Sequence, residues 1–156
     1  MKKKILIGAT TGLLIDQISK LIIINSLNLY ERIPVIRDFF NITYVQNEGA
    51  AWGILDGNIL FLVAITLVAL FFICRFIFRD NNISKIEGIA YGMLLGGILG
   101  NLTDRIVHNY VIDFFDFKIF NYDFPVFNIA DSLIVISAIL LVFSCFRGDK
   151  NESNSR

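Results

Sequence analysis

The strongest constraint on this chain is that its apolar residues fall into four long runs, at about residues 5–24, 59–78, 86–103 and 127–146. A helix needs roughly 20 mostly apolar residues to cross the hydrocarbon core of a bilayer. Hydrophobic residues make up 55% of the chain and charged residues only 18%, whereas a soluble domain typically has about 25% charged residues. We therefore predict a mainly α-helical membrane protein, a single domain of residues 1–156 built on a bundle of four transmembrane helices.

The first run begins like a secretory signal, because three lysines precede it. We interpret it instead as a retained helix, since no A-x-A cleavage site follows and the apolar pattern resumes after DQISK. If the N-terminus is cytoplasmic, nine of the 14 Lys and Arg residues lie on inner segments. The positive-inside rule then predicts that both termini are cytoplasmic. The polar tail, about residues 148–156, is expected to be disordered.

Two segments then face outward, at about residues 26–57 and 104–126. Around residues 33–46 the first has an alternating, β-branched and aromatic pattern, which predicts one or two short strands on the membrane surface. The stretch GAAWG follows and contains the single tryptophan, Trp52. This residue is interpreted either as an interfacial anchor or as part of a substrate entrance.

Glycines recur every fourth residue in the third run, at Gly88, Gly92, Gly96 and Gly100. Such a stripe lets another helix approach closely, either within the chain or between chains, and a monomer is expected. The net charge of zero argues against a nucleic-acid partner. The chain has no HExxH motif and no Cys/His cluster, so neither a metal nor another cofactor is expected.

Several polar residues interrupt the apolar runs. Asp16 and Lys20 are four residues apart in the first run, which suits an ion pair that helps the helix to insert. Asp16 could also face a polar cavity. In GNLTDR, Asn101, Asp104 and Arg105 share one helix face. They could form a helix-end cluster at the lipid headgroups, or Arg105 could hold a carboxylate.

Two further acids lie near the outer ends of the runs. Asp113 is surrounded by Val, Ile and Phe in VIDFFDF, and such surroundings raise the pKa of a carboxyl group. Asp131 stands at the front of the fourth run, three residues after Asn128, where it could simply cap a helix. The chain has one histidine, His108, which gives little support to a Ser-His-Asp or Cys-His arrangement.

Carboxylate chemistry is therefore the favoured prediction. Two carboxylates that share one proton can take a proton from water and donate one to a leaving amine. This predicts peptide hydrolysis by activated water, without a covalent intermediate. From spacing alone, Asp104 with Asp131 is a fair alternative to Asp113 with Asp131.

Five motifs in order, DQISK, NEGAAWG, GNLTDR, VIDF and FNIADS, resemble those of the bacterial lipoprotein signal peptidases, over nearly the whole chain. The resemblance implies an aspartic endopeptidase of the bacterial plasma membrane, with its active site at the outer face and a small β-cradle on four helices. Its partners would be membrane lipids and its substrates diacylglyceryl-modified prolipoproteins, cleaved just before the lipidated cysteine. Inhibition by globomycin-type compounds is implied in the same way.

The resemblance also implies roles for individual residues. The catalytic pair would be Asp113 and Asp131, and Asp104 belongs to a family motif. Because Arg105 is adjacent to it, we expect Arg105 to keep Asp104 ionised, in a structural role. The Trp52 loop and the strands around 33–46 would clamp the substrate from outside. Other residues implied to line or support the site are Asp16, Asn47, Asn101, Arg105, Asn128 and Ala130.

The main alternative from another class is a small proton-linked transporter or channel subunit. Asp16 with Asp104 and Arg105 could form a proton relay. The acids cluster at one interface, however, and inverted repeats are not apparent. A purely structural membrane scaffold would not explain acids in Phe-rich surroundings.

Overall fold

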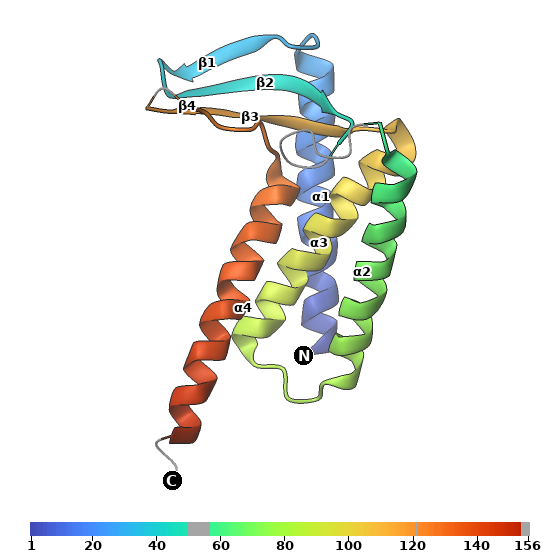
Figure 1. Ribbon diagram of the computed structural model, residues 1–156, viewed down its shortest axis with the longest axis vertical. Helices are drawn as coiled ribbons and strands as arrows, with labels where there is room; N and C mark the ends of the chain where they lie inside the picture. Colours follow the sequence, from blue (N-terminus) through green and yellow to red (C-terminus); the bar gives the residue numbers. More distant parts are fainter. Residues whose placement is uncertain (50–56, 121, 154–156) are drawn as a thin grey trace.

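The computed structural model describes residues 1–49, 57–120 and 122–153, and Figure 1 shows a helical bundle capped at one end by a small sheet. Both the start of α1 and the end of α4 lie at the opposite end of the bundle. In chain order the elements are α1 (Lys2–Ser26), β1 (Arg32–Ile36), β2 (Phe40–Asn47), α2 (Ile59–Arg79), α3 (Lys85–His108), β3 (Val111–Ile119), β4 (Tyr122–Asp123) and α4 (Ile129–Ser153).

Three of these helices are long and apolar enough to cross a membrane: α1, α2 and the Ile129–Phe146 part of α4. Among the described helices α3 does not meet this measure, since glycines and polar residues dilute its apolar side chains. It contacts α1, α2 and α4, and so occupies the centre of the bundle (Figure 1). The four-span count predicted from the sequence therefore stays a prediction.

The glycine stripe of α3 packs against α1 and α4 of the same chain. A Cβ atom on Gly92 would lie 3.3 Å from the Cα of Gly8, and one on Gly96 would lie 2.9 Å from the carbonyl oxygen of Ala9. The absence of side chains thus brings the two backbones together. Of the two possibilities for the stripe, the structure shows packing within the chain.

The sheet is antiparallel, with strand order β1-β2-β3-β4. Strands β1 and β2 confirm the predicted strands around residues 33–46. A hydrophobic cluster fastens the sheet to the C-terminal end of α1, where Ile23 and Leu27 pack on Tyr44, Ile112 and Phe114. Since β3 takes part in this cluster, its position relative to the helices is fixed.

Strand β3 was not predicted from the sequence, although VIDFFDFKI is rich in the β-branched and aromatic residues that favour strands. Helix α3 also continues beyond residue 103 to His108, and it ends at Asn109 in the left-handed conformation, with φ of 63°. The expected disorder of the tail is wrong as far as Ser153, because α4 continues to that residue. Lys and Glu in this stretch are good helix formers and no proline interrupts it. Trp52 lies outside the described residues, so neither interpretation of it is tested.

Candidate active site

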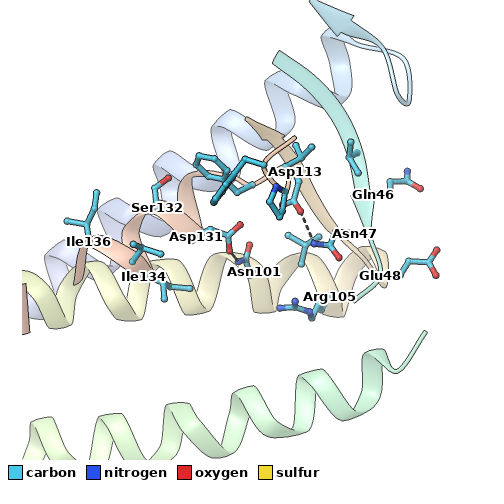
Figure 2. Close-up of a pocket in the computed structure, with 17 residues that line it drawn as sticks. Gln46, Asn47, Glu48, Asn101, Arg105, Asp113, Asp131, Ser132, Ile134 and Ile136 are labelled. Carbon is cyan, nitrogen blue, oxygen red and sulfur yellow. Dashed lines mark hydrogen bonds between the residues drawn. The ribbon is translucent and has the colours of Figure 1, made fainter. Parts of the chain in front are cut away.

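A cavity of about 850 Å³ lies where α3, α4 and the sheet meet. Five of its polar lining residues come from four elements: Asn47 from β2, Asn101 and Arg105 from α3, Asp113 from β3, and Asp131 from α4 (Figure 2). The rest is largely apolar and includes Phe124, Pro125, Val126, Phe127, Ile134, Val135 and Ile136. Polar residues that are far apart in the sequence are thus gathered in an otherwise apolar hollow.

Asp113 and Asp131 both line this cavity, and each is held by hydrogen-bond donors. Asp113 accepts from Asn128 Nδ2 at 2.7 Å and from Asn47 Nδ2 at 2.9 Å. Asp131 accepts from Asn101 Nδ2 at 2.7 Å and from the backbone N–H of Asn128 at 3.2 Å. Both carboxyl groups are therefore fixed in orientation by amides from neighbouring elements.

The orientation of the Asn101 amide is determined by its surroundings. Its Oδ1 accepts hydrogen bonds from Lys20 Nζ at 3.0 Å and from Asn128 Nδ2 at 3.1 Å. Lysine ammonium and amide nitrogen can only donate. The oxygen of Asn101 must therefore face them, and its nitrogen must face Asp131.

Asp131 also has the capping role that the sequence suggested. Its backbone N–H donates to Asn128 Oδ1 at 2.9 Å, and the Asn128 N–H donates back to its carboxylate. This reciprocal pair is a capping box at the start of α4. Capping uses Oδ2 of Asp131 and leaves Oδ1 to Asn101, so the cap does not exclude a role for Asp131 in the cavity.

Beneath the cavity lies a buried ion cluster centred on Lys20. Its Nζ is 2.8 Å from Asp16 Oδ2 and 2.8 Å from Asp104 Oδ2, and all three side chains are at most 1% exposed. The predicted ion pair of Asp16 with Lys20 is confirmed. Asp16 does not line the cavity, but its Oδ1 accepts from the backbone N–H of Ala130 at 2.8 Å and so holds the start of α4.

Arg105 was expected to keep Asp104 ionised, and the structure adds a closer cation, because Asp104 forms its ion pair with Lys20. Asp104 also accepts from Gln17 Nε2 at 2.8 Å and from the backbone N–H of Ile112 at 3.1 Å. Sequence reasoning missed this supporting role of Lys20 and Gln17. The signal was present in DQISK, where polar residues interrupt an apolar run.

Arg105 instead lines the cavity, and its Nη2 donates to the carbonyl oxygen of Gly49 at 3.1 Å. Its Nε is buried and has no hydrogen-bond partner among the residues described. A buried donor without a partner is costly. The guanidinium group can therefore donate a hydrogen bond to an acceptor that enters the cavity.

Burial raises the pKa of Asp113 from its usual value to about 7, and the negative charge of Asp131 adds to this effect. Hydrogen bonds from Asn47 and Asn128 act in the opposite direction and lower that pKa in part. A carboxyl group with a pKa near 7 can both accept and release a proton at neutral pH. In residues 1–49, 57–120 and 122–153, no group of three or more His, Cys, Asp or Glu residues could hold a metal ion.

Comparisons with known proteins agree over most of the chain. The family model described as signal peptidase (SPase) II matches residues 9–147. A lipoprotein signal peptidase of Halothermothrix orenii is 41% identical over 138 residues, 88% of this chain and 92% of the relative. One from Staphylococcus aureus is 38% identical over 159 residues, covering 99% and 98% of the two chains.

Two solved structures, both described as bacterial membrane enzymes, are similar to this fold. One, at 2.3 Å resolution, has a TM-score of 0.87 and 37% identity, covering 94% of this chain and 90% of its own. The other, at 1.9 Å, has a TM-score of 0.81 and 38% identity, covering 90% and 91%.

Proposed function

The chain belongs to the signal peptidase II family and is an aspartic peptidase, and from this premise we propose that Asp113 and Asp131 are its catalytic pair. The substrate would be a diacylglyceryl-modified prolipoprotein, cut just before the lipidated cysteine. The observation that carries this proposal is that both carboxyl groups line one cavity, each fixed by amide donors. With the pKa of Asp113 raised to about 7, the pair can hold one proton at neutral pH.

In this mechanism the ionised carboxylate takes a proton from a water molecule between the two acids. The water oxygen attacks the carbonyl carbon that precedes the lipidated cysteine. The C–N bond then breaks, and the protonated carboxyl group gives its proton to the departing amino group. Because a coupled pair of this kind titrates as a unit, acid and base are not assigned to individual residues.

Arg105 is suited to stabilising the negative charge that develops on the carbonyl oxygen. Its buried Nε lacks a partner among the described residues, and its side chain lines the same cavity. Donors that are already oriented toward a developing oxyanion lower the barrier without reorganising during the reaction. Asn47, Asn101 and Asn128 would hold the two carboxyl groups, with Asp16, Ala130 and Asp104 supporting them from below.

The membrane arrangement belongs to the same proposal. The whole chain would form one domain with four spans, cytoplasmic termini and the active site at the outer face of the bacterial plasma membrane. The signal helix of the substrate would approach from the lipid side, where Ile134 and Ile136 line the cavity. Its acyl chains would stay in lipid, and the sheet would cover the scissile bond. The enzyme would act as a monomer and be inhibited by globomycin-type compounds.

The test is cleavage of a diacylglyceryl-modified prolipoprotein by the purified protein in lipid. Asp113→Asn and Asp131→Asn should each abolish cleavage while melting like wild type. Asp104→Asn should keep some activity or lose stability, because Asp104 is paired with Lys20 outside the cavity lining. Wild-type cleavage by Asp113→Asn would make Asp104 with Asp131 the better pair.

A matched control is available on the same strand. Asp116 is also buried, but it contacts Arg32 and Asn41 and does not line the cavity. Asp116→Asn should therefore cleave at close to the wild-type rate. If wild type itself fails to cleave a lipidated substrate, the proposed function is wrong.

A further inference from the structure

The lining of the cavity changes from apolar to polar along its length. Figure 2 shows Ile134 and Ile136 at one end, Asp131 and Asp113 in the middle, and Glu48 at the end near the sheet. The end near Ile136 is apolar, and the isoleucines there belong to the candidate membrane span of α4, Ile129–Phe146. The opposite end opens beside β2, where the lining becomes polar.

This order sets the direction of a substrate chain, if the proposed function is correct. An apolar signal helix suits the end near Ile134 and Ile136. The residues that follow the scissile bond must then leave past the other end. Asn47 contacts Asp113 and Glu48 follows it directly. Because consecutive Cα atoms are about 3.8 Å apart, Glu48 lies one residue beyond the Asn47 contact, and the first residues after the lipidated cysteine would pass it.

Glu48 is exposed, and among the described residues it makes no ion pair or side-chain hydrogen bond. The cation in the lining is Arg105, whose Nη2 is already bonded to the carbonyl oxygen of Gly49. The two catalytic candidates add further negative charge to the same cavity. The exit therefore presents an acid whose charge is available to a passing chain.

We propose that Glu48 is a specificity-determining residue, which favours substrates with Lys or Arg at the second or third position of the mature lipoprotein and disfavours those with Asp or Glu. This inference rests on the proposed function and extends it to the leaving side of the substrate. Exposed ion pairs are weak, so the preference should be roughly two- to five-fold in kcat/KM. It should shrink as salt is added, because dissolved ions screen the interaction between exposed charges.

The experiment compares three diacylglyceryl-modified prolipoproteins that differ only at the second mature residue, which is Lys, Ser or Glu. Wild type, Glu48→Gln and Glu48→Lys are assayed in the same lipid at low and high salt. Wild type should prefer the Lys substrate, Glu48→Gln should cut all three at similar rates, and Glu48→Lys should prefer the Glu substrate. Each rate is divided by that of the Ser substrate in the same variant, so that a change in overall activity does not alter the comparison.

Asp38→Asn is the matched control, because Asp38 is an exposed acid in the turn after β1 that does not line the cavity. Its left-handed backbone, with φ of 58°, also accommodates Asn. This variant should keep the wild-type preference. If the ratio of kcat/KM for the Lys substrate to kcat/KM for the Glu substrate is the same in wild type, Glu48→Gln and Glu48→Lys, the inference is overturned. The proposed function then still stands. If wild type cuts none of the three, the proposed function fails first.

Discussion

Asn128 donates a hydrogen bond of 2.7 Å from its side-chain nitrogen to Oδ1 of Asp113, and its backbone N–H donates to Asp131 at 3.2 Å. One residue at the start of α4 therefore contacts both acids of the proposed catalytic pair. Its side-chain nitrogen also reaches Asn101 Oδ1, which joins the two carboxyl groups through a chain of amides. The geometry of the pair thus depends on a residue that is itself fully buried.

Asn128→Asp should lower kcat and also lower the Tm, because its carboxyl oxygen would face the buried acceptors of Asp113 and Asn101. Asp is as good a helix cap as Asn, but it replaces the donor that faces Asp113 with an acceptor. Hydrogen bonds to charged groups contribute about 1.5–3 kcal/mol, so cleavage should fall roughly 10- to 100-fold. Asn25→Asp is the control, because Asn25 is exposed and, among the described residues, its side chain bonds only to Leu21 of its own helix. Wild-type cleavage by Asn128→Asp would show that this contact is dispensable.

The raised pKa of Asp113 predicts how folding stability depends on pH. The unfolded chain ionises this group near its ordinary pKa of about 3.9, whereas the folded protein holds the proton until about pH 7. The stabilisation is therefore fully present below about pH 4 and is lost as the pH rises to about 7. Between these values the Tm of wild type should fall more steeply with pH than the Tm of Asp113→Asn.

Parallel melting curves from pH 4 to 8 in one detergent would measure this difference. Asn25→Gln serves as control, since it neither adds nor removes a titratable group and Asn25 is exposed on α1. The slope of its Tm against pH should equal that of wild type. Superimposable slopes for wild type and Asp113→Asn would mean that Asp113 is ionised across this range.

Lys20→Met should strongly destabilise the protein, because it leaves two buried carboxylates without their cation. Breaking a buried ion pair by removing one partner costs about 3–5 kcal/mol. Adding Asp16→Asn and Asp104→Asn to the same chain should restore much of the lost stability. Lys118→Met, at an exposed end of β3, is the control and should change the Tm little. A Lys20→Met protein that melts like wild type would contradict the ion cluster.

Gly97→Ala should reduce cleavage by displacing the start of α4. A Cβ atom at this position would lie 2.5 Å from the carbonyl oxygen of Ala130, the neighbour of Asp131. Overpacking of this kind costs about 1–3 kcal/mol, and here the strain falls on a residue next to the proposed pair. Gly8→Ala is milder, because its nearest contact would be Gly92 Cα at 3.3 Å. Equal activity of the two variants would show that α4 accommodates the added methyl group without a displacement of Asp131.

Much of the site could be predicted from the residues because its members stand in short motifs. Asp113 in its apolar surroundings and Asp131 at a helix start were recognisable as acids that needed an explanation. The ion-pair partner of Asp104 could not be recognised in this way, because the prediction considered Arg105, its neighbour in the sequence. The actual partner, Lys20, is 84 positions away in sequence and comes from another helix. Helix packing brought it there, and no local pattern records such a contact.

The sequence by itself determined that the chain is a membrane protein, that its acids gather near one end of the helices, and that one or two strands precede the second apolar run. These properties follow from the length of apolar runs and from side-chain alternation, which are local. Only the tertiary structure decided which donors hold each carboxyl group and where Lys20 and Gln17 lie. It also decided that the glycine stripe packs against α1 and α4. The physical reason is that these contacts join residues distant in the chain, and they exist only after close helix packing has excluded water from the polar cluster.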